Sequence, residues 1–370
     1  MTDALGEVTD NEIMKAVRLF EHGGPEVLQY VDVPMEHPGP GEVLVRVRAT
    51  AVNQWDLRYR SGKLPPNPLP GRPAWPIPFQ LGRDAAGDIV EVGAGVTRWN
   101  VGDRVVQMPH PACGQCPMCL RGRDNLCINT AYPGHQTFGG YAEFIVRSQH
   151  AVLPIPEKVE YEAAAATLWA YTTPLNCALR RAPVGIGDTV VITGASGGLA
   201  TACVQIAKLL GARTIGTTTK PERTEQLLAL GYDHIIDSNQ PNAATQVKTL
   251  SGGLGADAVW DCVGGTEFLR LSVSFVRLGG AVAVLGAPVT QDGFDLEINS
   301  LAFIFGELDI VGVRAATRRD QQLCMQLLGE GKIQPVIDRV FPLREAAEAH
   351  RYLERQSQVG KVLLVPDETN

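Results

Sequence analysis

Residues 189–200 are TVVITGASGGLA, and this stretch decides the fold. Its apolar first half is typical of a buried strand, and the small residues that follow keep the spacing G-x-x-G-x-x-A. Small side chains let the backbone turn sharply and approach a diphosphate, and the N-terminus of the next helix presents N–H groups to it. In this strand–loop–helix setting the motif favours a dinucleotide-binding loop over a plain tight turn. The predicted contacts are Gly194, Ser196, Gly197, Gly198 and Leu199.

The segments around this loop alternate between two patterns. From residue 172 to residue 313, strand-like runs such as RTIGTTT (213–219) and DAVWDCV (257–263) alternate with amphipathic helical runs such as ATACVQIAKLLGA (200–212). Such alternation is typical of a parallel sheet wrapped by helices. The sequence therefore predicts a doubly wound Rossmann domain over residues 172–313.

The rest of the chain has a different character. Residues 14–171 contain short β-rich runs separated by Gly, Pro and Asp, which predicts a β-rich domain. Within it, residues 61–80 contain seven prolines and are expected to form an extended loop. Residues 314–370 hold two helical runs and a final strand, and we expect them to return to the first domain. Residues 1–13 are expected to be a mobile extension.

Composition and charge limit the classes of function. A chain of 370 residues, 45% hydrophobic and 20% charged, suggests about two domains. The net charge of −7 disfavours nucleic acid and anionic membranes as partners. No apolar run reaches the length of a membrane span, and the acidic N-terminus does not resemble a signal peptide. We therefore expect a cytoplasmic protein with a small-molecule substrate, no nucleic-acid partner and no membrane association.

Four of the eight cysteines are clustered. Cys113, Cys116, Cys119 and Cys127 have the spacing C-x2-C-x2-C-x7-C. Zinc favours four thiolates in a tetrahedron, and the clustering fits this better than free surface thiols or a redox-active CxxC pair. Because the protein supplies all four ligands, the predicted zinc is structural, with one ion per chain in a lobe at about residues 108–130. The four remaining cysteines are expected to be buried core thiols.

The end of the strand after the glycine loop bears on the cofactor. An NAD site usually carries an acid there to bind the ribose hydroxyls. This chain has Thr218, followed by Lys220 and Arg223. The missing acid removes repulsion of a 2′-phosphate, and the two cations attract it, so the sequence predicts NADPH. The alternative is that both cations are solvated charges at the start of a helix.

Together with these features, four further segments resemble one family: AVNQWD (51–56), LGRDAAGDIVEVGAGV (81–96), VGDRVV (101–106) and GGYAEF (139–144). They are similar to the medium-chain dehydrogenase/reductase superfamily of zinc-binding alcohol dehydrogenases and quinone oxidoreductases. The resemblance implies a GroES-like catalytic domain followed by a Rossmann domain, and homodimers or homotetramers formed through the Rossmann sheet edge. It also implies cofactor contacts at Val263, Leu285, Gly286, Val311, Val313 and Lys361.

The chain departs from the family's zinc alcohol dehydrogenases at the catalytic metal. By resemblance, Asn53 stands at the position of a cysteine ligand and Arg83 at that of the histidine ligand, and a further cysteine expected near Trp169 is missing. Arg58 replaces a relay histidine. A catalytic zinc site of the Cys2His type is therefore not expected here. His135, in the loop before GGYAEF, is expected to be a hydrogen-bonding loop residue.

These departures have a pattern of their own. Residues 52–62, VNQWDLRYRSG, resemble the VNxxDxxxRxG segment of quinone oxidoreductases, in which Asn and Asp line the nicotinamide site. The resemblance gives that role to Asn53, Asp56 and Tyr59. For Asp56, a salt bridge with Arg83 or Arg58 that only holds the loop is an equal alternative. Asn53, Tyr59 and Arg83 are candidate hydrogen-bond donors to the substrate, and Tyr59 or water is the candidate proton source.

The predicted function is hydride transfer from NADPH to a quinone or an α,β-unsaturated carbonyl without a catalytic zinc. Such acceptors spread the developing negative charge by resonance, so hydrogen-bond donors can stabilise it. One alternative is an alcohol dehydrogenase or carbonyl reductase of the same superfamily. An alternative of another class is a non-catalytic NADPH-binding protein.

Overall fold

The structure is a computed structural model that describes residues 12–63, 77–287 and 296–367. The chain divides into two compact units: unit 1 comprises residues 1–169 and 317–370, and unit 2 comprises residues 170–316. Unit 1 is rich in strands and unit 2 contains a parallel sheet covered by helices, which confirms the predicted α/β class. Most of the expected N-terminal extension (1–13) and of the expected proline-rich loop (61–80) lies outside the described residues; Ile13 already belongs to a strand.

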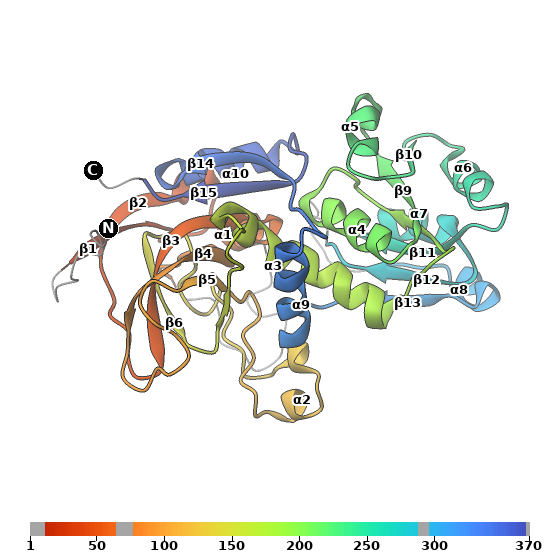
Figure 1. Ribbon diagram of the computed structural model, residues 1–370. Coiled ribbons are helices and arrows are strands. Elements are labelled where there is room, and N and C mark those ends of the chain that lie inside the picture. Colours follow the sequence, from red (N-terminus) through yellow and green to blue (C-terminus); the bar gives the residue numbers. More distant parts are fainter. Residues whose placement is uncertain (1–11, 64–76, 288–295, 368–370) are drawn as a thin grey trace. The chain divides into compact units, whose positions relative to one another are not determined.

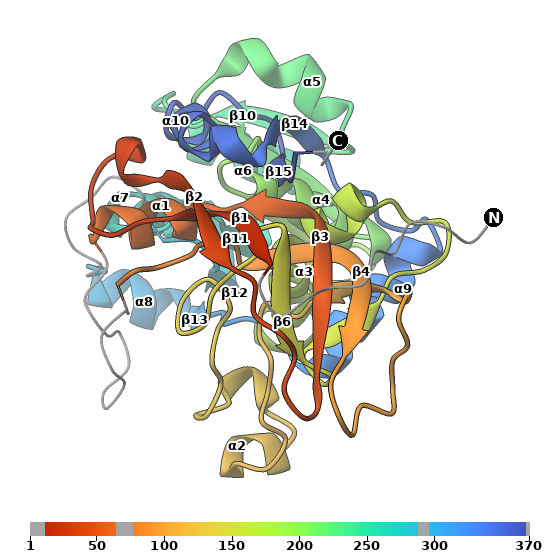
Figure 2. The same cartoon turned by 90° about the vertical axis from the view of Figure 1, so that its left-hand side faces the viewer.

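A mixed sheet forms the body of unit 1. Its strands follow the order β14-β15-β3-β4-β5-β7, and β6 also pairs with β3 (Figure 2). β1 and β2 form a separate antiparallel pair. The strands are β1 (Ile13–Arg18), β2 (Gln29–Pro34), β3 (Glu42–Val52), β4 (Asp84–Val92), β5 (Arg104–Gln107), β6 (Phe144–Ser148), β7 (Val152–Pro154), β14 (Ile337–Pro342) and β15 (Lys361–Val365).

The strand β3 is central to this sheet because it pairs with β4, β6 and β15. Its sequence EVLVRVRATAV buries valines and alanines while Arg46 and Arg48 lie at half-buried and exposed positions. β15, from the C-terminal end of the chain, pairs antiparallel with the last residues of β3, with Val362 opposite Val52. Continuing that register by one residue sets Lys361 opposite Asn53.

Short helices complete unit 1. Helix α9 lies beside the cysteine lobe that carries α2 (Figure 1), and the Arg318 N–H at its start donates to the Asp124 carboxylate at 2.8 Å. The helices are α1 (Gln54–Ser61), α2 (Pro117–Leu120), α9 (Arg318–Gly329), α10 (Ala346–Glu354) and the 3-10 turns η1 (Pro25–Val27), η2 (Asp124–Leu126) and η5 (Leu343–Glu345).

Unit 2 is built on six parallel strands in the order β10-β9-β8-β11-β12-β13. In chain order this is 3-2-1-4-5-6, the doubly wound Rossmann arrangement, whose ligands bind at the carboxyl ends of the strands. The core lies between sheet and helices, and Trp260 is fully buried in it. The strands are β8 (Thr189–Ile192), β9 (Arg213–Thr218), β10 (His234–Asp237), β11 (Ala256–Asp261), β12 (Val276–Val284) and β13 (Asp309–Gly312).

The helices of unit 2 follow the strands in alternation, as the sequence pattern predicts (Figure 1). Helix α3 (Tyr161–Asn176) crosses the boundary between the units and continues into the π-helix η3 (Cys177–Arg181). Among the described residues, no helix has the length and apolar character needed to cross a membrane. The others are α4 (Gly198–Leu209), η4 (Pro221–Arg223), α5 (Thr224–Leu228), α6 (Ala243–Leu250), α7 (Thr266–Phe275) and α8 (Ser300–Gly306).

Candidate functional site

The glycine loop of unit 2 connects β8 to helix α4, as its sequence predicts. Gly194 has φ +63°, a left-handed conformation that favours glycine, and Gly197 is the N-cap of α4. The Ala195 N–H donates to Thr217 O at 2.9 Å, which fixes the loop against β9. The loop therefore sits at the carboxyl end of the central strand, where the N–H groups of α4 are available to an anion.

The loops after β11 and β12 pack backbone to backbone beside it. A Cβ on Gly286 would lie 2.1 Å from Cys262 O, so no side chain fits there. The N–H groups of Leu285 and Gly286 both donate to Asp261 O at 2.9 Å, and the Val313 N–H donates to Val284 O at 3.1 Å. The structure thus brings the loops of Val263, Leu285, Gly286 and Val313 to the same sheet edge as the glycine loop; Val311 lies within β13.

The end of β9 carries the residues predicted to distinguish NADPH from NADH. Thr218 is buried, and its hydroxyl accepts a hydrogen bond from the Lys220 N–H at 3.0 Å. Lys220 directly precedes the short turn η4 and Arg223 is its last residue; both are half-buried. Thr218 therefore ends β9, where the sequence comparison expects an acid in an NAD site, and two cations follow it along the chain.

In unit 1, aromatic side chains pack closely around the side chain of Arg83. Its guanidinium Nη2 donates to the Tyr59 hydroxyl at 3.0 Å and lies 3.2 Å from His135 Nδ1. The guanidinium also lies over the rings of Tyr132 at 4.9 Å and Trp169 at 4.7 Å. The residue is only 4% exposed, and its Nε has no hydrogen-bond partner among the described residues.

The same cage fixes Tyr59 and His135 against each other. Their rings stack with centroids 4.6 Å apart, and burial raises the pKa of Tyr59. Because Arg83 is always protonated, it acts only as a donor, so the Tyr59 oxygen and His135 Nδ1 accept from it. His135 is therefore the hydrogen-bonding loop residue that the sequence suggests, but it belongs to the environment of Arg83.

A second buried network links Asn53, Asp84 and Lys361. The Asn53 side chain donates to Asp84 Oδ2 at 3.0 Å and accepts from the Lys361 ammonium, which lies 4.0 Å from the same carboxylate oxygen. Burial raises the pKa of Asp84 and lowers that of Lys361. The side-chain NH2 group and the side-chain oxygen of Asn53 thus both form hydrogen bonds within unit 1.

This placement differs from the role expected for Lys361. The sequence resemblance suggests that it reaches a cofactor phosphate, but the ammonium is 6% exposed and already contacts Asn53 and Asp84 within unit 1. A buried ammonium stays only where such partners offset its desolvation. These contacts favour a role for Lys361 in the support of Asn53 over contact with a cofactor phosphate.

Asp56 lies at the start of α1, fully enclosed. Its carboxylate accepts from the Asn53 N–H at 2.7 Å, which caps the helix. Burial raises the pKa of Asp56 to about 7, although Arg83 and Lys361 act in the opposite direction. Of the two interpretations left open by the sequence, these contacts favour a supporting role for Asp56 over contact with a substrate.

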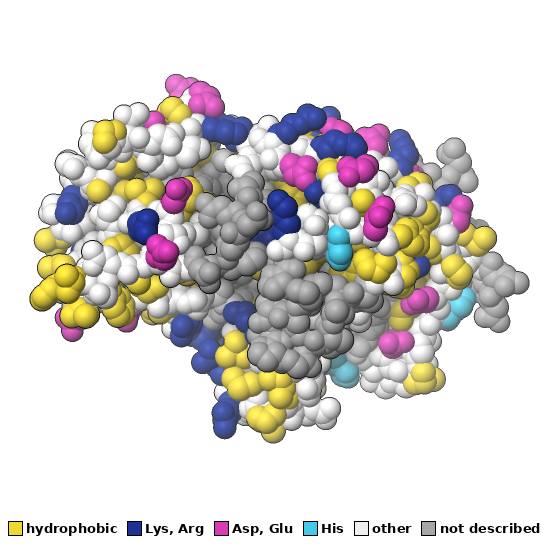
Figure 3. Space-filling view, turned by 180° about the vertical axis from the view of Figure 1, so that it is seen from behind, with side chains coloured by type: hydrophobic (Ala, Val, Ile, Leu, Met, Phe, Trp, Pro, Cys, Tyr) yellow, Lys and Arg dark blue, Asp and Glu magenta, His cyan; other side chains and the backbone are white. Residues whose placement is uncertain are grey.

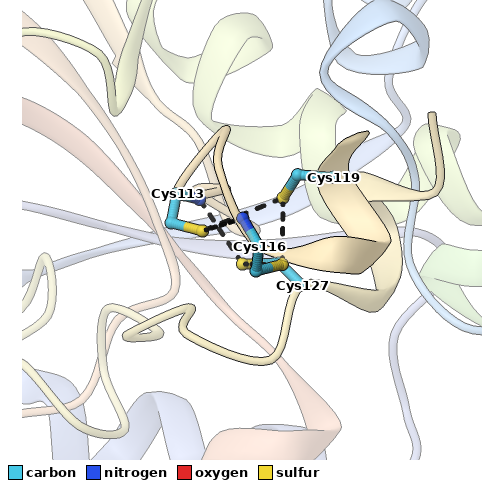
Figure 4. Close-up of side chains that lie close together, drawn as sticks. All are labelled: Cys113, Cys116, Cys119 and Cys127. Atoms are coloured by element: carbon cyan, nitrogen blue, oxygen red, sulfur yellow. Dashed lines mark hydrogen bonds between the residues drawn. The ribbon is translucent and has the colours of Figure 1, made fainter. Parts of the chain in front are cut away.

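The four predicted zinc ligands converge on one point in the lobe (Figure 4). Their sulfur atoms all lie within 4.8 Å of one another. The Cys116–Cys119, Cys116–Cys127 and Cys113–Cys119 sulfurs are 3.5, 3.9 and 4.0 Å apart. Four sulfurs at zinc–sulfur distances of about 2.3 Å form a tetrahedron with edges of about 3.8 Å, so the cluster can hold this ion.

Backbone groups support the same cluster. The N–H groups of Cys113 and Cys116 point at the sulfurs of Cys127 and Cys113, each at 3.4 Å. The Cys119 N–H lowers the pKa of Cys116 to about 6, whereas burial raises the pKa of Cys127. Such N–H···S contacts stabilise thiolates, the form that binds a metal.

Three residues of the unit 1 site were not predicted as functional from the sequence: Asp84, Tyr132 and Trp169. Asp84 accepts from both the Asn53 side chain and the Trp169 N–H, the latter at 3.2 Å. Trp169 stacks on His110 with centroids 5.1 Å apart. The sequence nevertheless pointed to Asp84 and Trp169. Asp84 follows Arg83, which stands at the position of the histidine ligand, and Trp169 lies near the position expected for a cysteine ligand.

Family models match both parts of the chain. The alcohol dehydrogenase GroES-like domain matches residues 39–157, and the zinc-binding dehydrogenase model matches residues 230–364. A quinone oxidoreductase of Rattus norvegicus is 30% identical over 96% of this chain and 99% of its own length. The chain belongs to the medium-chain dehydrogenase/reductase superfamily. It is an oxidoreductase of that superfamily, and its β-rich unit has the GroES-like fold.

Two further relatives show the range of named activities. An acryloyl-coenzyme A reductase of Metallosphaera sedula is 30% identical over 95% of this chain and 99% of its own length. A crystal structure of an NAD-dependent alcohol dehydrogenase has a TM-score of 0.87 and 34% identity, covering 96% of this chain and all of its own. Medium-chain dehydrogenases/reductases therefore share this fold while their names differ in substrate and cofactor.

Asp56 predicts a pH dependence of stability. Its folded pKa of about 7 exceeds the usual carboxyl value of about 3.9, so folding takes up a proton between these values. Its contribution to the free energy of unfolding is therefore greatest below about pH 4 and declines as pH rises to about 7, by at most about 1.4 kcal/mol per pH unit. Asp56→Asn should lack this decline in urea titrations at pH 5 and 8. Asp32→Asn, at a surface carboxylate paired with Lys15, is the control and should not reproduce the effect.

The four clustered thiols predict the number of zinc ions that each chain binds. The parent should retain one zinc per chain, and Cys116→Ser should lose it, because three thiolates hold zinc less well than four. Elemental analysis measures the ratio, and limited proteolysis measures opening of the lobe. Cys324→Ala, at a buried thiol outside the cluster, should keep one zinc. Two zinc ions per chain, or none after gentle purification, would contradict the assignment.

Proposed function

We propose that the protein is an NADPH-dependent reductase of quinones or α,β-unsaturated carbonyls that works without a catalytic zinc. The observation that carries the proposal is the buried guanidinium of Arg83, held by Tyr59 and His135 within an aromatic cage. By family resemblance, this position belongs to a metal ligand. A guanidinium has no lone pair to give to a metal, so Arg83 has a different task.

Arg83 is suited to stabilise negative charge on an oxygen. When bound, NADPH supplies the hydride from its nicotinamide. An acceptor whose carbonyl is conjugated then carries negative charge on oxygen, and a buried cation with an available N–H stabilises that charge strongly. The Nε of Arg83, which has no partner among the described residues, is the candidate donor. A simple ketone or alcohol lacks this delocalisation and would depend more on a metal.

Tyr59 is the proposed source of the proton. Its oxygen accepts from Arg83, so its own O–H hydrogen is directed away from the guanidinium. Burial raises the pKa of Tyr59, with the positive charge of Arg83 acting in the opposite direction, so Tyr59 keeps its proton until a basic oxygen is formed beside it. Asn53, Asp56 and Lys361 hold the surrounding strands and helix in place, and we propose no contact with substrate for them.

The proposed cofactor site lies in unit 2. The loop of Gly194, Ser196, Gly197, Gly198 and Leu199 would bind the diphosphate at the N-terminus of α4. The neighbouring loops of Val263, Leu285, Gly286, Val311 and Val313 would contact the nicotinamide. Thr218, Lys220 and Arg223 would bind the 2′-phosphate. The four thiols of the lobe would hold a structural zinc that takes no part in the reaction.

A homodimer or homotetramer is part of the proposal. Helix α8 exposes a run of apolar side chains near the edge strand β13, and hydrophobic side chains gather at that end of unit 2 (left in Figure 3). Exposed apolar patches of this kind are typical of protein interfaces. The exposed side chains include Leu278, Leu301, Phe303, Ile304 and Phe305. The cytoplasmic location remains a prediction.

Substitution of Arg83 tests the chemistry. Arg83→Met should lower kcat for NADPH oxidation with 1,4-quinones or enones by about 100-fold, the usual effect of losing one donor to an oxyanion. The dissociation constant for NADPH should change little, because Arg83 is proposed to act on the oxygen of the acceptor and not on the cofactor. Arg83→Lys should recover part of the rate. Arg339→Met removes an exposed arginine stacked on Phe341 and is the matched control.

Three results would decide against the proposal. Steady oxidation of simple alcohols, lost on chelation that spares the lobe zinc, would indicate a zinc alcohol dehydrogenase. NADPH binding without turnover of any quinone, enone or aldehyde would indicate a binding protein. Full quinone or enone reductase activity in folded Arg83→Met would remove Arg83 from the mechanism.

Thr218 tests the cofactor. The parent should prefer NADPH to NADH by more than about tenfold in kcat/KM, since charge-assisted hydrogen bonds to a phosphate contribute about 1.5–3 kcal/mol each. Thr218→Asp should shift the preference toward NADH, because a carboxylate repels the 2′-phosphate. Lys208→Ala removes a cation from α4 that pairs with Asp233 and should leave the preference unchanged. Equal kcat/KM for both cofactors in the parent would contradict the assignment.

A further inference from the structure

Two cysteines outside the zinc lobe lie in direct contact within unit 2. Cys203 belongs to helix α4, and Cys262 follows strand β11; their sulfurs are 3.5 Å apart. Cys203 is fully buried and Cys262 is half-buried. Both are separate from the four thiols assigned to zinc, and neither has a role in the proposed reaction.

Cys262 is tied to the glycine loop by a chain of hydrogen bonds. Its N–H donates to the Thr193 hydroxyl at 3.0 Å, and that hydroxyl donates to the Asp261 carboxylate at 2.8 Å. The same carboxylate oxygen accepts from the N–H groups of Val263 and Gly264, both at 3.0 Å. Thr193 directly precedes Gly194, so the backbone around Cys262 and the start of the loop form one unit.

The backbone around Cys262 is tightly packed against the neighbouring glycines. A Cβ on Gly194 would lie 2.8 Å from Val263 Cγ2, and one on Gly286 would lie 2.1 Å from Cys262 O. A displacement of Cys262 therefore has to move Val263, Gly194 or Gly286. These are residues to which the proposed function assigns cofactor contacts.

We propose that Cys203 and Cys262 form an oxidative modification site, at which a hydroperoxide converts the two thiols to a disulfide that weakens cofactor binding. In the first step the Cys262 sulfur attacks the peroxide, the O–O bond breaks, and Cys262 becomes a sulfenic acid while the rest of the peroxide leaves as water or an alcohol. In the second step the Cys203 sulfur displaces water from that sulfenic acid. In sum, two thiols and one hydrogen peroxide give one disulfide and two waters.

The order of the two steps follows from exposure. Cys262 is the more accessible thiol, so it meets the peroxide first. Burial raises the pKa of Cys203 well above the usual thiol value, which disfavours its own reaction with peroxide. Its sulfur lies 3.5 Å from that of Cys262, which places it to attack a sulfenic acid formed there. Cys177, in η3, is a third buried thiol that interacts electrostatically with Cys203 and Cys262, so its variant tests whether it takes part in the oxidation.

Formation of the disulfide requires the two sulfur atoms to move closer together, and we expect this movement to displace the loop that carries Cys262. A disulfide has an S–S length of about 2.05 Å, so the sulfurs must approach by about 1.5 Å from their separation of 3.5 Å. Cys203 is fixed in a fully buried helix face, which leaves Cys262 and its loop to move. The expected consequence rests on the proposed function: NADPH should bind on the order of tenfold more weakly, the effect of losing one or two hydrogen bonds.

The experiment uses the full zinc-loaded chain, reduced and then treated with a limited amount of hydrogen peroxide. Mass spectrometry of non-reduced peptides should find a peptide pair joined through Cys203 and Cys262, and dithiothreitol should reverse it. Assignment at the peptide level separates this bond from oxidation of the zinc ligands. The NADPH dissociation constant, from fluorescence titration, should rise about tenfold on oxidation and return on reduction.

Matched variants isolate the pair. Cys203→Ala and Cys262→Ala should bind NADPH as the reduced parent does and should show no change on oxidation, whereas Cys177→Ala should behave as the parent. Absence of the joined peptide in the oxidised parent would overturn the modification site. An unchanged dissociation constant in protein shown to carry the bond would overturn its link to the cofactor. Failure of the reduced parent to bind NADPH would instead count against the proposed function, while the peptide result would still decide the disulfide.

Discussion

A permanent positive charge is buried at position 83, and the neighbouring part of unit 1 is arranged around it. Burial of an ion is costly unless nearby groups replace its hydration. The Tyr59 oxygen, His135 Nδ1 and the faces of Tyr132 and Trp169 do this for the guanidinium. Two buried acids, Asp56 and Asp84, interact electrostatically with the guanidinium but form no direct salt bridge with it among the contacts described. Their contacts go instead to Asn53 and Lys361, so Arg83 keeps hydrogen-bonding capacity that a tight ion pair would consume.

The two polar centres of unit 1 differ in what they leave available. In the lobe, four sulfurs face one another at distances that suit a tetrahedral metal, so every ligand direction is used within the protein. At Arg83, a donor remains without a partner among the described residues. A closed centre stabilises a local fold, whereas an open donor can act on a bound molecule. The proposed function follows this contrast, because it assigns a structural zinc to the closed lobe and the stabilisation of charge to the Arg83 guanidinium.

Whether a contact could be predicted from the sequence depends on how far apart its two residues lie along the chain. The glycine loop and the four cysteines are local patterns, with all members within fifteen residues, and spacing alone shows how they converge. The contact of Lys361 with Asn53 joins residues 308 positions apart, and only the pairing of β15 with β3 brings them together. Motif matching therefore placed Lys361 at a phosphate, whereas sheet register places it beside Asn53. Arg83 was recognised as a departure from the family pattern, but its aromatic cage depends on loops that no local pattern predicts.

The substituted positions also contact one another, and this bears on why they changed. Asp84 accepts from the Asn53 side chain and from the Trp169 N–H, while the Trp169 ring lies under the Arg83 guanidinium. Asn53 and Arg83, which stand at the positions of metal ligands by resemblance, and Trp169, near the position of the third, are thus connected through Asp84 and a cation–π contact. Random loss of a metal site would leave unsatisfied polar groups or a cavity, each of which costs stability. Among the described residues, Asn53, Asp84 and Trp169 satisfy one another in this way, whereas Arg83 keeps one buried N–H without a partner, which is the donor that the proposed reaction would use.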